Sequence, residues 1–312
     1  MEMLMRQRQL SQFLAVCRNR SVSRAAAELN IAQSALSRQI TRLEHDMGAE
    51  LFIRHSQGVT LTRAGQALRE EAADLLRRMN DLKLRVKQQS SDVSGDVTLV
   101  VITSIASALA VELYPRFERD YPNIRLRVID HPSDTAAARL LQHEADLAVI
   151  PNTAADMPHA QSRPLFEETF VFLSRAAPGA KATEITFSEA ASYPLALPFY
   201  GYDLRRRLEE AARNSGTALK VKYETGSINV IGELVEEGLA CSIVPPTFWL
   251  PRIASGKVMA RPLVAPKVSR VHSLGWLPSA PLSPAVETVR EVTALSVRSL
   301  IECGKLLGIL VD

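Results

Sequence analysis

The first fifty residues place apolar side chains at helical spacing. In residues 33–47 the apolar positions are separated by steps of four, three and four, so they share one face of an expected helix. These positions are Leu36, Ile40, Leu43 and Met47. A shorter helix is expected over residues 24–29, with Ser21 or Ser23 as its cap and Asn30 in the following turn. The pattern therefore predicts two helices joined by a tight turn.

The opposite face of the longer helix is polar and carries no acid before Glu44. It presents Ser34, Ser37, Arg38, Thr41 and Arg42. A helix that is buried on one side and carries hydroxyl and guanidinium groups on the other suits the DNA major groove. We expect base contacts from its first turns, with Arg38 suited to guanine and Gln33 to adenine. The alternative is an ordinary surface helix with scattered polar groups.

Residues 51–61 are predicted to form two short strands around a Ser-Gln-Gly turn, which would make a wing beside the helix pair. Arg54 in this hairpin and Arg42 on the helix are expected to contact phosphates, which position a protein on DNA without specifying sequence. The complete set of candidate DNA-binding residues is Arg24, Gln33, Ser34, Ser37, Arg38, Thr41, Arg42 and Arg54.

A second helical pattern follows, with apolar positions at alternating steps of four and three. They are Leu68, Ala72, Leu75, Met79, Leu82 and Val86. These positions form one apolar face over nearly three heptads, which we call the heptad seam. An isolated helix would expose this seam to water, so pairing with a second copy is favoured. The alternative is an amphipathic helix packed on its own domain, because heptad order does not identify the partner.

Beyond a segment without periodicity, predicted to be a hinge, buried strands alternate with helices. The strands are expected at residues 97–103, 124–129 and 146–150, with helices at 104–120 and 133–142 between them. Ser133 is expected to cap the second of these helices. This order predicts a parallel sheet flanked by helices.

A second α/β half is expected to follow. Its strands are predicted at residues 168–173, 195–198, 220–224 and 240–244, and its helices at 202–214 and 228–237. A strand at 272–277 is expected to return the chain to the first half, before a last helix at 284–303.

Charge is unevenly distributed, although the 312-residue chain carries only +3 overall. Residues 1–65 contain nine Lys or Arg and five Asp or Glu, a balance of +4, whereas the remainder balances to −1. The positive charge therefore lies with the predicted helix pair, as phosphate binding requires. Hydrophobic residues make up 46% of the chain and charged residues 23%, so it can bury a sizeable core, and its length favours two or more domains.

Other chemistry is not indicated. Cys17, Cys241 and Cys303 show neither a disulfide framework nor metal spacing, which fits a reducing cytoplasm. No signal peptide is expected, and the longest uncharged run, residues 97–111, is shorter than the roughly 20 residues of a membrane span. No phosphate-binding loop, nucleophile motif or histidine ligand set is present, so no catalytic residue, metal or cofactor is predicted.

Several segments resemble the winged helix-turn-helix of the LysR-type transcriptional regulators. They are residues 24–29 (RAAAEL), 33–40 (QSALSRQI), 43–44 (LE), 48 (G), 51–52 (LF), 54 (R) and 61–65 (LTRAG). The similarity spans residues 8–69. One departure is Ser34, where the family often has proline and where the hydroxyl could cap the helix instead. The order of elements beyond the hinge also resembles the family's effector domain, which is built like a periplasmic binding protein.

The resemblance implies an α/β chain of four parts. A winged helix-turn-helix is expected at residues 1–65, a linker helix that pairs two copies at 66–88, a hinge at 89–95 and an effector-binding domain at 96–312. The last is expected to contain one subdomain of residues 96–164 and 272–312 and a second of residues 165–271.

Ligands of open α/β sheets bind outside the carboxyl ends of the strands, and four such ends are expected to converge in this chain. The candidate effector-binding residues are Thr103, Ser104, Ile105, Asn152, Phe199, Tyr200, Thr225 and Ser227. Hydroxyls at helix starts favour an anion such as a carboxylate, and Phe199, Tyr200 and Tyr202 leave an aromatic or amphipathic ligand open. The alternative for each residue is helix capping or loop packing.

In the family, such a chain binds promoter DNA as a dimer, usually within a tetramer. A small-molecule effector alters the DNA bend and with it the contact with RNA polymerase. No membrane association is expected. One alternative is a ligand-independent architectural DNA-binding protein, and a second is an enzyme fused to a DNA-binding domain, which would need a catalytic constellation in residues 95–312.

Overall fold

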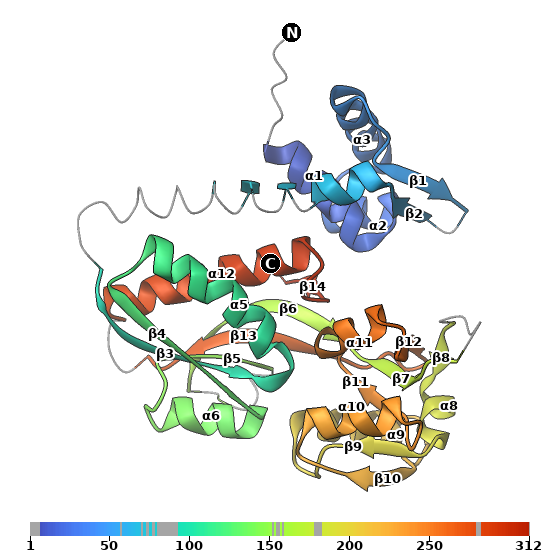
Figure 1. Cartoon of the computed structure of the whole chain (residues 1–312), viewed down its shortest axis with the longest axis vertical. Helices are drawn as coiled ribbons and strands as arrows, with labels where there is room; N and C mark the ends of the chain where they lie inside the picture. The colour runs from blue at the N-terminus through green and yellow to red at the C-terminus, as the bar shows by residue number, and fades with distance from the viewer. Residues whose placement is uncertain are drawn as a thin grey trace. The chain divides into compact units, whose positions relative to one another are not determined.

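A computed structural model describes residues 7–56, 58–69, 71–72, 75–76, 79, 93–151, 153, 157, 159–177, 183–278 and 282–311. The chain forms two compact units. The first comprises Met1–Asp92 and Glu291–Leu306, and the second comprises Val93–Arg290 and Leu307–Asp312. Figure 1 shows the helices and strands of both.

The first unit begins with three helices and a hairpin: α1 (Gln7–Asn19), α2 (Val22–Glu28), α3 (Gln33–Met47), β1 (Phe52–His55) and β2 (Gly58–Leu61). The predicted cap at Ser21 is confirmed, because its Oγ accepts a hydrogen bond from the N–H of Arg24 at 3.3 Å. Gly48 ends α3 in the left-handed conformation at φ 65°, which glycine adopts at little cost.

The core of this unit gathers the apolar faces of the helices against the hairpin. Leu36, Ile40 and Leu43 are buried with Phe13 of α1, whose ring lies 5.3 Å from that of Phe52 in β1. Each such side chain stabilises the fold by roughly 1.5–3 kcal/mol relative to exposure. The spacing of apolar residues along α3 is therefore explained by the packing of one helix face.

The second unit is built on a six-stranded sheet in the order β14-β6-β13-β5-β3-β4. The strands are β3 (Gly95–Ile102), β4 (Ile124–His131), β5 (Leu147–Pro151), β6 (Gln161–Thr169), β13 (Ser269–Trp276) and β14 (Ile309–Leu310). β3 pairs in parallel with β4 and β5, whereas β13 runs antiparallel to β5 and β6. The helices α5 (Thr103–Asp120) and α6 (Ser133–Leu141) cover opposite faces of the sheet (Figure 1). β3 is apolar throughout its second half because it is covered on both faces.

The other half of this unit contains a four-stranded sheet in the order β11-β7-β12-β8 and the parallel pair β9–β10. The strands are β7 (Val171–Arg175), β8 (Ile185–Thr186), β9 (Leu195–Leu197), β10 (Val221–Glu224), β11 (Ser242–Val244) and β12 (Val258–Val264). The helices are α8 (Phe187–Ser192), α9 (Asp203–Asn214), α10 (Ile228–Glu236), the 3-10 turn η1 (Thr247–Trp249) and α11 (Leu250–Ala254). The last helix, α12 (Pro284–Glu302), precedes β14 and is divided between the units, since residues from Glu291 onward belong to the first.

The expected single strand over residues 168–173 is wrong. The structure has two strands, since β6 ends at Thr169 in the six-stranded sheet and β7 begins at Val171 in the four-stranded sheet. Phe170 between them is fully buried, and its N–H donates to the carbonyl of Val268 at 2.9 Å. The sequence carries no sign of the change of sheet, because buried side chains both precede and follow Phe170. The chain crosses back between β12 and β13.

Candidate DNA interface and effector cleft

The candidate base-reading residues lie on the solvent side of α3. Gln33, Ser34, Arg38, Thr41 and Arg42 are exposed, and Ser37 is half-buried. Their orientation follows from the buried face, because fixing the apolar stripe in the core turns the polar stripe outward. Arg24 of α2 is also exposed. The DNA-binding roles of these residues remain predictions.

The expected cap at Ser34 is wrong. α3 has Ala32 as its N-terminal cap, and no side chain caps the helix there. Ser34 lies one position inside the helix and is exposed. The backbone N–H groups of the first turn of α3 therefore lack a side-chain acceptor, and their partial positive charge is the kind that phosphate oxygens match.

The wing is held to α3 by Glu44. One carboxylate oxygen of Glu44 accepts hydrogen bonds from the N–H groups of Leu51 and Phe52, at 3.0 and 3.2 Å. Arg54 is exposed on β1, and His55 contacts Thr60 across the hairpin at 2.9 Å. This structural role of Glu44 was not predicted. Its position as the first acid after the polar face of α3 was a feature of the sequence that could have indicated it.

The predicted heptad seam divides between two environments. Leu68 packs against the core of the first unit and Ala72 is 1% exposed within it, which matches the alternative of packing on its own domain. Leu75, in contrast, is 41% exposed, and Met79 is half-buried. Leu82 and Val86 lie outside the described residues. The dimerisation role of the seam remains a prediction.

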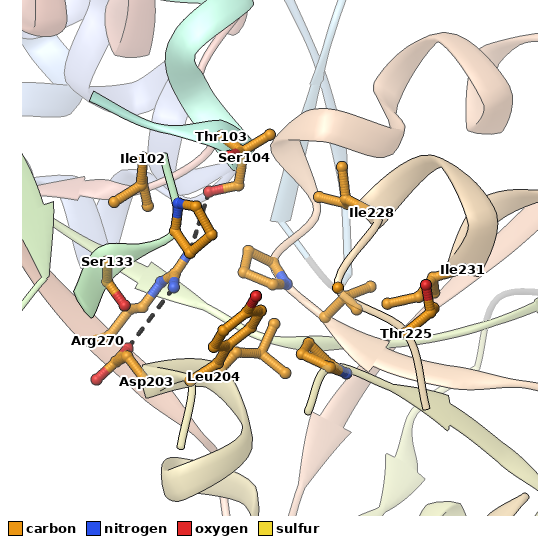
Figure 2. A pocket seen from close by; sticks show the side chains of 16 residues that line it. Ile102, Thr103, Ser104, Ser133, Asp203, Leu204, Thr225, Ile228, Ile231 and Arg270 are labelled. Atoms are coloured by element: carbon orange, nitrogen blue, oxygen red, sulfur yellow. Dashed lines mark hydrogen bonds and ion pairs between the residues drawn. The ribbon is translucent and has the colours of Figure 1, made fainter. Parts of the chain in front are cut away.

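A cleft lies between the two halves of the second unit (Figure 2). It holds about 90 Å³ of free space, which limits it to a small molecule. Most of its wall is apolar, and its polar lining residues are Thr103, Ser104, Ser133, Tyr202, Asp203, Thr225 and Arg270. The cleft therefore fits a small molecule of mainly apolar surface with a few polar atoms.

Three of the candidate effector-binding residues line this cleft: Thr103, Ser104 and Thr225. Ile105 is instead buried beneath the start of α5 at 2% exposure. Phe199 and Tyr200 are exposed loop residues that are not among the lining residues, although Phe199 packs beside the lining residues Gly226 and Tyr202. Ser227 caps α10 by accepting from the N–H of Val230 at 3.4 Å, so the helix-cap alternative describes it better. Asn152 lies outside the described residues.

Four further polar residues line the cleft. Tyr202 had been considered only as a possible aromatic contact, and Ser133, Asp203 and Arg270 were missed as candidates. Ser133 was expected to cap α6, which is wrong, because Pro132 is the cap position and no side chain caps the helix. Asp203 begins α9, and Arg270 lies on β13, two residues before the strand was expected to start. Arg270 and His272 are two positions apart and therefore share one face of β13. This spacing of polar residues was the sequence feature from which a role for Arg270 could have been inferred.

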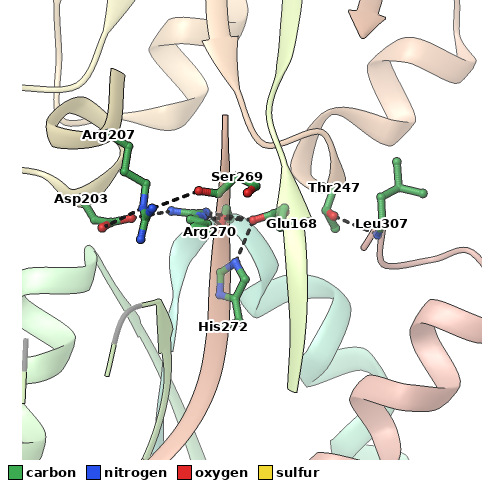
Figure 3. A network of polar contacts seen from close by, with 9 residues as sticks. Glu168, Asp203, Arg207, Thr247, Ser269, Arg270, His272 and Leu307 are labelled. Atoms are coloured by element: carbon green, nitrogen blue, oxygen red, sulfur yellow. Dashed lines mark hydrogen bonds and ion pairs between the residues drawn. The ribbon is translucent and has the colours of Figure 1, made fainter. Parts of the chain in front are cut away.

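Arg270 is the centre of a buried polar network (Figure 3). It is the cross-strand partner of Glu168, and its Nε and Nη2 donate to Glu168 Oε2 at 3.2 and 3.1 Å. Nη2 also donates to Ser104 Oγ at 3.0 Å, and Nη1 lies 3.6 Å from Asp203 Oδ2. Since Glu168, Asp203 and Arg270 are each at most 5% exposed, removing one partner would leave an uncompensated buried charge.

His272 extends the network away from the cleft. Its Nε2 lies 2.8 Å from Glu168 Oε2, and its ring stacks on Phe166 with centroids 4.4 Å apart. Burial lowers the pKa of His272, against the opposing effect of Glu168. Burial alone would raise the pKa of Glu168, but the Arg270 charge and the His272 hydrogen bond together hold it below its ordinary value.

Helix starts surround the cleft. α5, α6 and α9 begin at the lining residues Thr103, Ser133 and Asp203, and none of them has a side-chain cap. Backbone N–H groups in these first turns are therefore free of side-chain acceptors and are suited to a ligand oxygen. Within the described part of the chain, no group of three or more His, Cys, Asp or Glu residues is placed to hold a metal ion. Nor is any described helix long and apolar enough to cross a membrane.

Two family models match the chain. The model described as LysR substrate binding domain matches residues 90–295, and the model described as bacterial regulatory helix-turn-helix protein, lysR family, matches residues 7–66. Between them they cover both the helix pair with its wing and the two halves that enclose the cleft.

Individual proteins give the same result. The chain is 30% identical to the HTH-type transcriptional regulator BbuR of Bordetella bronchiseptica over 81% of this chain and 78% of that protein. It is 27% identical to the HTH-type regulator YybE of Bacillus subtilis, over 91% of this chain and 96% of that protein. The solved structure of the Corynebacterium glutamicum OxyR C206 mutant has the same fold, with a TM-score of 0.58 and 20% identity over 96% of this chain and 92% of that chain.

Proposed function

Because the chain belongs to the LysR family of DNA-binding transcriptional regulators, we propose that α3 and the wing bind promoter DNA and that a small effector in the cleft controls this binding. The observation that carries the proposal is the cleft. It is small, has a mainly apolar wall, and is lined by three helix starts without side-chain caps. The chain acts by binding the effector rather than by transforming it.

On the DNA side, Gln33, Ser34, Ser37, Arg38 and Thr41 read base edges in this proposal. Arg24, Arg42 and Arg54 contact phosphates. The exposure of Gln33, Ser34, Arg38, Thr41 and Arg42 on α3 supports these roles, together with the +4 balance of residues 1–65.

Two copies pair through the exposed part of the seam, and pairs associate into a tetramer, so several DNA-binding units meet one promoter region. Effector binding changes the DNA contacts of this assembly and thereby its contact with RNA polymerase. An effector can shift such an equilibrium only by binding one state more tightly than the other.

The proposed effector-binding role of the cleft can be tested by filling the cleft with a large side chain. Thr225→Trp places a bulky ring at the cleft wall, whereas Asn229→Trp places the same ring on the exposed surface of α10, outside the lining. Full-length wild-type protein is screened by thermal unfolding against a library of small metabolites. Compounds that raise the unfolding midpoint of the wild type should also stabilise Asn229→Trp and should not stabilise Thr225→Trp.

Two results would contradict the proposed cleft. Equal stabilisation of both tryptophan variants would place the binding site elsewhere. A library in which no metabolite stabilises the wild type would favour the ligand-independent DNA-binding alternative.

A further inference from the structure

A second pocket lies within the first unit. It holds about 340 Å³ of free space, compared with about 90 Å³ in the cleft. Its walls come from the end of α1, the turn after it, both strands of the wing and the helical residues 63–69. Within the described residues, α3 contributes nothing to this lining, so the pocket is separate from the helix face expected to enter the DNA groove. The polar lining residues are Cys17, Arg20, Thr60, Gln66 and Arg69.

The charged residues of this lining are two arginines. Arg20 is exposed in the turn after α1, and Arg69 is half-buried on the helix that follows the wing. The backbone of Gly304 lies against the Arg69 guanidinium, since a Cβ on Gly304 would be 3.1 Å from Nη2. Among the described residues, Arg69 Nε is buried without a hydrogen-bond partner, and neither arginine forms an ion pair. A guanidinium shielded from water without a counter-charge is costly, so an anion in this pocket would stabilise the unit.

The acids that contact the end of α1 pair with a different arginine. Glu28 pairs with Arg18, and Glu302 Oε1 lies 3.8 Å from Arg18 Nη1. Cys17 supplies no negative charge, because burial raises the pKa of its thiol to about 12 against the opposing effect of the Arg69 charge. These two acids and the three arginines at and beside the pocket leave a positive surplus even when both acids are ionised.

We propose that this pocket binds a small phosphate group between Arg20 and Arg69, as a ligand site separate from the effector cleft. A phosphate monoester carries about −1.5 to −2 charge at neutral pH, which matches two guanidinium groups. Its oxygens also accept the paired hydrogen bonds of an arginine fork. The pocket has room for more than the phosphate itself, so the ligand is either the free ion or the head of a small phosphate monoester. Either one joins the turn after α1 to the helix after the wing.

Calorimetric titration tests this site. Full-length wild-type protein, freed of nucleic acid, is titrated at neutral pH and fixed ionic strength with inorganic phosphate, with glycerol 3-phosphate and with glycerol. We expect at least one of the two phosphates to bind and glycerol not to bind, and the tighter phosphate identifies the source of the group. Arg69→Gln and Arg20→Gln should each weaken this binding about tenfold or more.

Two variants serve as controls. Arg8→Gln removes an exposed arginine at the other end of α1 and should bind phosphate as the wild type does. Thr225→Trp fills the cleft and should also leave phosphate binding unchanged. In phosphate-free buffer, Arg69→Gln should keep the unfolding midpoint of the wild type or raise it, because the variant removes a half-buried charge without a counter-charge. If Arg69→Gln is destabilised, the exposed position of Arg20 lets Arg20→Gln decide the question.

The proposal is overturned if neither phosphate binds, or if Arg20→Gln binds phosphate as tightly as the wild type. Loss of phosphate binding in Thr225→Trp would place the phosphate in the cleft and would also overturn it. Binding to unrelated DNA separates this site from the DNA interface. The salt dependence of that binding should be equal in Arg69→Gln and Arg8→Gln, whereas a slope lower by about one in Arg69→Gln alone would assign Arg69 to the DNA backbone instead.

Discussion

Arg38 illustrates how one side chain's direction follows from its helix. It lies two residues after Leu36 and two before Ile40, both of which are buried, so it is turned to the exposed face of α3. Arg42, one turn further on, lies on the same face and its Nε is 3.9 Å from Asp46. The two arginines share an environment but are assigned different partners on DNA, bases for Arg38 and phosphates for Arg42.

This difference gives a prediction for a DNA site selected in vitro from random sequence. Arg38→Ala should weaken binding to the selected site by about 1–3 kcal/mol and barely change binding to unrelated DNA. Arg42→Ala is the control and should weaken both, because a phosphate contact is independent of sequence. Electrophoretic or fluorescence titrations measure both affinities. If Arg38→Ala weakened both DNAs equally, Arg38 would not read a base.

His272 makes the stability of the second unit depend on pH. Burial lowers the pKa of His272, so the folded protein keeps the ring neutral where the unfolded chain takes up a proton near the ordinary value of 6.5. Stability is then present above this value and is lost as the pH falls below it. The lowered pKa of Glu168 acts in the same direction, since its contribution is lost as the pH falls through its folded value.

We therefore expect the free energy of unfolding to fall more steeply in wild type than in His272→Gln as the pH is lowered from about 7.5 to about 5.5. Urea unfolding at a series of pH values measures this difference. His159→Gln changes an exposed histidine and should follow the wild type. A wild type that gains stability over His272→Gln in acid would mean that His272 is protonated in the fold.

At the scale of elements, the helix after the wing shows why spacing alone cannot name a partner. Leu75 belongs to the heptad seam and is 41% exposed, whereas its neighbour Leu76 does not belong to it and is 5% exposed in the core of the first unit. The apolar spacing was visible in the sequence. The side of this helix that faces the core of the first unit depends on where α1 and the wing lie. The spacing of apolar residues along the sequence carries no information about those positions.

The two leucines should consequently behave differently when replaced. The double variant Leu75→Glu and Leu82→Glu, the second in a position outside the described residues, should lower the oligomeric state and operator affinity with little loss of stability. Leu76→Ala should instead destabilise the first unit by about 2–5 kcal/mol through the cavity it leaves, with the assembly retained. Sedimentation and thermal unfolding of the same samples distinguish these effects. A double glutamate variant that sediments as the wild type would exclude the seam as the pairing surface.

The limits of a helix were predicted correctly where the apolar spacing and the residues that end a helix agreed. α3 has the expected limits because the apolar stripe ends where Gly48 allows a left-handed residue. It failed over residues 168–173, where a continuous apolar run passes from one sheet to another at Phe170. It also failed for the caps of α3 and α6, because a serine near a helix start satisfies the sequence rule whether or not its hydroxyl reaches an N–H.

At the scale of the whole molecule, the sequence determined that the chain has two structurally different parts. Residues 7–66 and 90–295 carry the patterns of two different folds, and the positive charge lies with the first. These features were readable because helix amphipathicity, turn residues and charge balance are local properties of the chain.

Only the tertiary structure decided the character of the cleft. Ser104, Glu168, Asp203 and Arg270 are far apart in sequence, and they meet because β13 returns beside β6 and directs Arg270 towards the starts of α5 and α9. The sequence alone allowed a carboxylate effector, since hydroxyls and helix starts favour anions. The fold brings the carboxylate of Asp203 to 3.6 Å from Arg270 at the cleft, and such distances between charged groups depend on the tertiary structure rather than on composition.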